Sequence, residues 1–129
     1  MAIGLATAQR NAGLDAITAA AGASAKLLFY NGVRPATGGA ITTLLATLIC
    51  NATFAPASAA GVLALNAITS AAAVATSTAT WARITTAGGG FVLDCNVGSA
   101  GSDINMSTTA FVTGATIAIT SFTITDGNP

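Results

Sequence analysis

The chain has 129 residues and a net charge of zero, with four lysine and arginine residues, four aspartates and no histidine. This length suits a single domain with its own core, and the lack of clustered basic side chains excludes nucleic acid as a partner, because such binding rests on many contacts to phosphate. Only 6% of the residues are charged, so little repulsion keeps copies of the chain apart, which favours a place within an assembly.

The N-terminal segment MAIGLATAQR has neither a basic start nor a long apolar run, so we expect no secretory signal and synthesis in the cytosol. Although 53% of the residues are hydrophobic, much of this content is alanine interleaved with threonine, serine and asparagine. A spanning helix needs about 20 predominantly apolar residues. The sequence therefore predicts no membrane segment.

Residues 6–21 are expected to form a helix, which Thr7 caps at its start and Gly22 ends. One stripe of this helix, at spacings of three and four, consists of Arg10, Leu14, Ile17 and Ala21. Because this stripe is thin and alanine-rich, the helix must lie against a sheet or a neighbouring subunit. We therefore assign residues 1–24 as an arm and helix packed on a β domain of residues 25–129.

From residue 25 the apolar period changes to two, which is typical of strands separated by glycine, proline and asparagine turns. Strands are expected at residues 25–30, 44–54, 62–69, 76–86, 91–98 and 111–127. Residues 33–40 are expected to be a loop, residues 71–75 a loop or loose edge, and residues 99–110 an exposed loop or short strand. This pattern predicts a mainly β fold with one N-terminal α-helix, as a β-sandwich or jelly-roll-like domain.

Alternation along the strands predicts which side chains face the core. In the second strand the apolar face consists of Leu44, Ala46, Leu48, Cys50, Ala52 and Phe54. Ile49 breaks this alternation and suggests that the outer face is partly covered. In the strand at residues 91–98 the apolar face consists of Phe91, Leu93, Cys95 and Val97. The last strand changes face near residues 120–121, which indicates either a β-bulge there or a strand covered on both sides.

Few residues carry reactive chemistry. Without histidine or glutamate, no catalytic triad or usual acid-base pair can form, so we expect no enzyme, no catalytic residue and no cofactor. Cys50 and Cys95 are too few for a zinc site; we interpret them as buried thiols, with a disulfide between them as the alternative.

Two other patterns have structural interpretations. Glycines 88–90 precede a strand, lack a following lysine and are interpreted as a hairpin turn rather than a phosphate loop. The pairs Asp94/Asn96 and Asp103/Asn105 offer oxygens to a cation but do not follow an EF-hand pattern, and these residue types also form turns. No metal ligand is assigned.

Five residues are candidates for a protein interface: Arg10, Tyr30, Arg34, Trp81 and Arg83. Trp81 and Arg83 point to the same side of their strand. Either Trp81 caps one end of the core while Arg83 is solvated, or the two form an interface hot spot, for which these residue types are enriched. The same two alternatives apply to Tyr30 and Arg34, which flank the Asn31-Gly32 turn.

The segment NAGLDAITAAAGASAKLLFYNGVRPATGGAITTLLATL, at residues 11–48, resembles small virion proteins of tailed bacteriophages that are encoded near the major capsid protein. The resemblance extends through residues 54–69, residues 79–94 and the Thr/Ile-rich end. It implies a head decoration, or cement, protein made in the host cytoplasm and placed on the capsid exterior of the virion. The implied partners are the major capsid protein and copies of the chain itself, as a dimer or trimer at local symmetry axes.

Two other functions remain as alternatives. A tail or fibre component would share this composition. A host- or carbohydrate-binding β module would need exposed aromatic side chains, and the chain has one tryptophan and one tyrosine. For the decoration protein, residues 1–9 and the loop at residues 31–39 are expected to reach toward neighbouring subunits.

Overall fold

The fold is given by a computed structural model that describes residues 4–106, 108–119 and 122–125. It is mainly β, with 35% of the described residues in strands and 13% in helix, the helix being α1 (Thr7–Ala21). The mainly β class and the N-terminal helix expected from the sequence are thus confirmed. Within the described residues, no helix is both long enough and apolar enough to cross a membrane.

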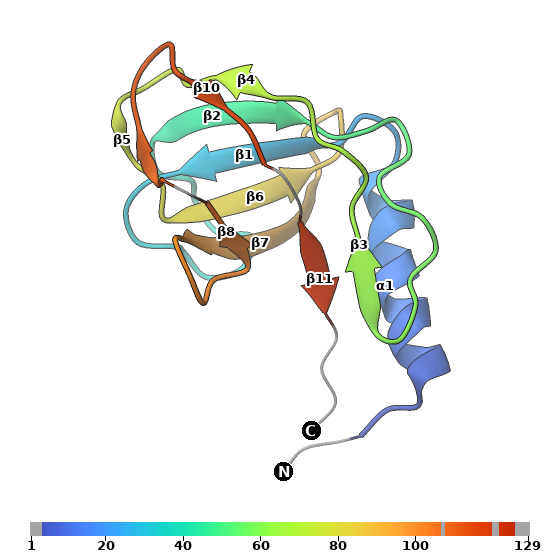
Figure 1. The fold of residues 1–129 in the computed structure, drawn as a ribbon. Coiled ribbons are helices and arrows are strands. Elements are labelled where there is room, and N and C mark those ends of the chain that lie inside the picture. Colours follow the sequence, from blue (N-terminus) through green and yellow to red (C-terminus); the bar gives the residue numbers. More distant parts are fainter. Residues whose placement is uncertain (1–3, 107, 120–121, 126–129) are drawn as a thin grey trace.

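Five strands form a curled main sheet in the spatial order β2-β1-β6-β7-β8 (Figure 1). They are β1 (Lys26–Tyr30), β2 (Leu44–Ile49), β6 (Trp81–Thr85), β7 (Phe91–Gly98) and β8 (Ile104–Asn105). The neighbours β2-β1, β1-β6 and β6-β7 pair antiparallel, whereas β8 runs parallel to the end of β7. The β6–β7 hairpin confirms that glycines 88–90 form a turn.

Three two-stranded pieces accompany the main sheet. They are β4 (Ala71–Ala72) with β10 (Thr116–Ile117), β3 (Val62–Ala64) with β11 (Thr123–Thr125), and β5 (Ser77–Thr78) with β9 (Ala110–Phe111). Each pair is antiparallel. In Figure 1, β4 and β10 lie beside β2 at one end of the molecule, while α1 packs against β3 at the other end.

Helix α1 ends where the sequence predicts and begins without a side-chain cap. Gly22 has φ +69°, a conformation that glycine adopts without strain, and its N–H donates to the Thr18 carbonyl. Ala6 holds the extended N-cap conformation, so Thr7 already lies inside the helix and the prediction that Thr7 is the cap is wrong. The Thr7 hydroxyl instead accepts a hydrogen bond from Arg10 at 3.2 Å.

The second strand is shorter than expected because Asn51 starts a turn. β2 ends at Ile49, and the Asn51 side chain accepts the Thr53 N–H at 3.0 Å, which is an Asx-turn that diverts the chain. The expected inward position of Ala52 is wrong, since Ala52 is exposed. A bulge also places Leu45 in the core, because Phe29 pairs with Ala46 while Tyr30 pairs with Leu44.

A second bulge changes the face of Phe91. In the β6–β7 pair, Ile84 lies opposite Leu93 but Thr85 lies opposite Phe91, so Val92 is the additional residue. One extra residue moves the side chains beyond it to the other face. The assignment of Phe91 to the core face is therefore wrong, whereas Cys95 and Val97 are buried as expected.

The expected later strands divide into shorter ones. The strand at residues 62–69 is confined to β3, and the strand at residues 76–86 divides into β5 and β6. The long strand expected at residues 111–127 is replaced by β9, β10 and β11, and Gly114, with φ +87°, lies in the turn between the first two. The proposed change of face at residues 120–121 lies outside the described residues.

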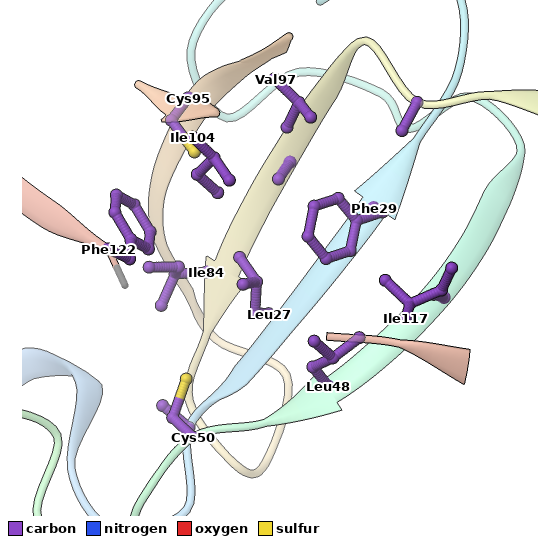
Figure 2. Packing of buried hydrophobic residues seen from close by; sticks show 14 of the residues in the cluster. Leu27, Phe29, Leu48, Cys50, Ile84, Cys95, Val97, Ile104, Ile117 and Phe122 are labelled. Atoms are coloured by element: carbon purple, nitrogen blue, oxygen red, sulfur yellow. The ribbon is translucent and has the colours of Figure 1, made fainter. Parts of the chain in front are cut away.

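The core lies on the inner face of the main sheet, where large apolar side chains from the sheet meet those of the smaller pieces (Figure 2). Those labelled in the figure are Leu27, Phe29, Leu48, Cys50, Ile84, Cys95, Val97, Ile104, Ile117 and Phe122. The Phe29 and Phe111 rings meet edge to face with centroids 5.4 Å apart. Since burial of each large side chain contributes about 1.5–3 kcal/mol, this face provides most of the hydrophobic stabilisation.

Cys50 and Cys95 are buried free thiols, which confirms that interpretation over the disulfide alternative. Burial raises the pKa of Cys50 to about 11. Burial, reinforced by the negative charge of Asp103, raises the pKa of Cys95 to about 12. Both thiols are therefore protonated at neutral pH.

The native chain is expected to resist the thiol reagent DTNB at mildly alkaline pH, because the reactive species is the thiolate and neither sulfur is accessible. The same chain in guanidinium chloride should release two equivalents of chromophore, one for each cysteine. Labelling of the single variants Cys50→Ser and Cys95→Ser shows which cysteine accounts for any residual reactivity. Fast labelling of the native chain would contradict the burial of these thiols.

Candidate interaction surface

The outer face of the main sheet carries an aromatic pair. This outer face, defined by alternate residues of β1 and β6 that point away from the core, includes Tyr30 and Trp81, whose rings stack with centroids 4.5 Å apart at an angle of 20°. Trp81 is 0% exposed. Its indole N–H lies 3.1 Å from both the Asn31 carbonyl oxygen and the Thr42 hydroxyl. The aromatic pair is thus enclosed by the chain itself.

The segment that encloses it is the covering loop, defined here as residues 31–43 between β1 and β2. Asn31 closes the loop at its base, because its side-chain oxygen accepts the Thr43 N–H at 3.2 Å and its carbonyl accepts the Thr42 hydroxyl. Gly32 has φ +76°, which allows the chain to turn directly after β1. The loop expected at residues 33–40 is confirmed, and it folds onto the sheet.

A buried ion pair holds the middle of the covering loop. The Arg83 guanidinium donates to the Asp94 carboxylate at 2.7 and 3.1 Å, and their side chains are 11% and 0% exposed. Arg83 also donates to the Gly39 carbonyl at 2.8 Å, and the Gly38 N–H donates to Asp94 at 3.0 Å. The alternative in which Arg83 is solvated is therefore wrong, because the hairpin register places Asp94 directly opposite it.

Charge is balanced inside this pair. Burial opposes ionisation of Asp94, but the hydrogen bonds from Arg83 and Gly38, with the positive charges of Arg83 and Arg34, leave its pKa below the usual range. The hydrogen bond to Asp94 raises the pKa of Arg83. Burial raises the pKa of Tyr30 and keeps its phenol neutral. At neutral pH the pair is fully ionised.

Next to the ion pair the outer face opens into a groove of about 340 Å³, which we call the outer groove. Its floor includes Lys26, Leu28 and Thr85, and Ile41 of the covering loop and Phe91 line its sides. Ile41 is 55% exposed and Phe91 is 45% exposed. The outer groove therefore offers accessible apolar surface at the end of the sheet that the covering loop leaves open.

Four of the five interface candidates converge on this outer face. Tyr30, Trp81 and Arg83 lie under or against the covering loop, and Arg34 donates from the loop to the Asn96 side chain at 3.2 Å. Arg10 lies elsewhere, on α1. The buried candidates thus position a surface and do not themselves form its exposed part.

Sequence reasoning missed the residues that form the open part of the surface. Phe91 was assigned to the core, and neither Lys26 nor Ile41 was singled out. Asp94 could have been identified from the sequence as the partner of Arg83, because a hairpin closed at glycines 88–90 places these two residues close together on neighbouring strands. Phe91 could not, because its position depends on the bulge in β7.

The two acidic pairs considered as cation ligands serve other roles. Asp94 binds Arg83, and Asp103 accepts the Asn96 N–H at 2.8 Å. Asn105 accepts the Ser102 N–H at 3.0 Å, as expected for a turn residue. In the part of the chain that the structure describes, no group of three histidine, cysteine or acidic side chains is placed to hold a metal ion.

No protein-family model, curated protein or solved structure matches this chain.

Proposed function

We propose that the chain is a structural virion protein, a decoration or cement protein that binds the outer surface of a tailed-phage capsid and stabilises contacts between capsomers. The observation that carries this proposal is the outer groove, where large apolar side chains are exposed on a sheet face that an ion pair and a stacked aromatic pair hold in place. Exposed apolar surface on a rigid element is typical of protein interfaces. The resemblance of residues 11–48 to such virion proteins supports the same function.

As part of this proposal, we expect the domain to have a sandwich-like architecture of two layers. The pieces β3–β11 and β4–β10 would form a second layer against the inner face of the main sheet, which leaves the outer face available to a partner. Attachment would then rest on buried apolar area repeated at each capsomer, so that many modest contacts together stabilise the expanded shell. A dimer or trimer at a local symmetry axis would increase this effect through multivalency.

Among the described residues, Phe91 is the exposed aromatic side chain, whereas Trp81 and Tyr30 are buried. Carbohydrate-binding modules stack sugars on exposed aromatic faces, so this arrangement favours a protein partner over a glycan. A tail or fibre component would use the same outer face. The location of the chain on the particle therefore distinguishes this alternative from a decoration protein.

The test is to measure the chain's location and copy number in purified particles. A decoration protein is expected on tailless heads, in a fixed ratio to the major capsid protein set by capsomer symmetry, and heads that lack it should release DNA at a lower temperature. Recovery of the chain with tails, in a few copies per particle, would overturn the proposal.

A further inference from the structure

We infer that the outer groove binds a segment of a partner protein that presents a large apolar side chain together with a carboxylate, with the carboxylate meeting Lys26. The inference rests on the proposed function only for the identity of the partner, which would then be the major capsid protein. The chemistry of the segment follows from the groove itself.

The apolar part of the segment is indicated by the walls of the outer groove. Leu28, Ile41 and Phe91 surround its open space, whose volume of about 340 Å³ suits one or two side chains rather than a large ligand. Phe91 is held in position, because the Arg83 guanidinium lies 5.1 Å from its ring centroid and the ring packs beside Gly38. A wall that is already ordered loses little entropy on binding.

The carboxylate is indicated by the charges on the outer face. Lys26 and Arg83 line the outer groove without an acidic side chain among its lining residues, and the nearby Asp94 is committed to Arg83. Lys26 lies opposite Ile49 on one side and Thr85 on the other, so its cross-strand neighbours are uncharged. Within the described residues Lys26 has no ion-pair partner. A ligand carboxylate would complement this excess of positive charge.

A second copy of the chain is a poor source of such a segment. Asp15 already accepts the Ser58 N–H, and Asp103 accepts the Asn96 N–H. The exposed residues beside these aspartates are small or polar, so neither carboxylate is adjacent to a large exposed apolar side chain. The described residues therefore do not offer this combination, which favours a different protein as its source.

The first arm of the test uses a short peptide, acetyl-Ser-Glu-Ser-Leu-Ser-amide, in which the glutamate and leucine point to the same side when extended. Titration into the intact ¹⁵N-labelled protein is expected to shift the amides of Lys26, Leu28, Thr85 and Phe91. Replacing the glutamate of the peptide by glutamine should weaken binding about two- to fivefold, and salt should reduce this difference. Shifts elsewhere, no shifts, or equal binding of the two peptides would overturn the inference.

The second arm measures attachment of variants to particles that lack the chain. Lys26→Glu and Ile41→Ser are each expected to lower the bound fraction about tenfold. The matched control is Val74→Ser, because Val74 is 62% exposed but does not line the outer groove. Particles that bind the wild type and both groove variants equally would overturn the inference but leave the proposed function intact. A chain that binds the peptide but no particle would overturn the proposed function and support the groove chemistry.

Discussion

Replacing Arg83 by methionine is expected to lower the free energy of unfolding by about 3 kcal/mol. The substitution leaves the Asp94 carboxylate, which is 0% exposed, without its bidentate partner, and breaking a buried pair from one side costs about 3–5 kcal/mol. It also removes the hydrogen bond to the Gly39 carbonyl, so the covering loop loses an anchor. Urea unfolding of the wild type and the variant measures the difference.

The double variant Arg83→Met with Asp94→Leu is the control for this prediction. Because it removes both charges, it is expected to recover much of the lost stability, and the cycle with the two single variants isolates the pair. Arg83→Lys should recover only part, since an ammonium cannot form two parallel hydrogen bonds to the carboxylate. A loss below about 1 kcal/mol in the methionine variant would mean that the pair behaves as a solvent-screened surface contact.

The same pair should make stability sensitive to acid. The folded pKa of Asp94 lies below its unfolded value, so its contribution is present above about pH 4 and is lost as the pH falls toward the folded pKa. The Arg83→Met variant should lose less stability over that interval than the wild type. Unfolding curves at several acidic pH values measure the two slopes.

The elements with local signals could be predicted from the sequence. Gly22 ends the helix, Gly32 allows the turn after β1, and glycines 88–90 close the β6–β7 hairpin, each for a reason contained in a few neighbouring residues. The buried positions of Leu48 and Cys95 also follow from simple alternation. These predictions needed no knowledge of distant contacts.

The errors at Phe91 and in the last strand arise where strand pairing decides the outcome. The bulges at Leu45 and Val92 depend on the register with β1 and β6, and each changes the face of the side chains beyond it. The last strand divides into β9, β10 and β11 because each pairs with a different, distant segment. Such pairings are tertiary and leave no local signal.

The candidate site shows the same limit. Residue type alone drew attention to Tyr30, Arg34, Trp81 and Arg83, and these four do come together. The burial of Tyr30, Trp81 and Arg83 could not be predicted, because it depends on the covering loop folding back over the sheet. Residue type left two alternatives for Trp81 and Arg83, a core cap beside a solvated arginine or an interface hot spot, whereas the structure places the exposed surface at Phe91 and Ile41.

Replacing Trp81 by alanine is expected to lower the free energy of unfolding by about 4 kcal/mol, the largest loss that we predict for a single substitution in this chain. The indole is fully buried, and removal of a buried aromatic side chain leaves a cavity and costs about 3–5 kcal/mol. The substitution also removes the ring that stacks on Tyr30 and the donor to the Asn31 carbonyl. Urea unfolding measures the loss.

The variant Trp81→Phe separates packing from hydrogen bonding. It retains a ring against Tyr30 but removes the indole N–H, so a loss of about 1–2 kcal/mol is expected. Hydrogen exchange should also become faster at Gly39, whose N–H donates to the Ala36 carbonyl at 2.7 Å within the covering loop. Unchanged exchange at Gly39 would show that the loop is held without Trp81.

The two Trp81 variants also decide how this residue contributes to attachment. If Trp81 contacted the capsid directly, its substitution would weaken binding while stability remained near the wild-type value. Because the side chain lies beneath the covering loop, attachment should instead fall together with loop protection, slightly in Trp81→Phe and strongly in Trp81→Ala. Particle binding at a temperature where both variants remain folded measures this relation, and strong loss with an intact loop would assign Trp81 to the interface itself.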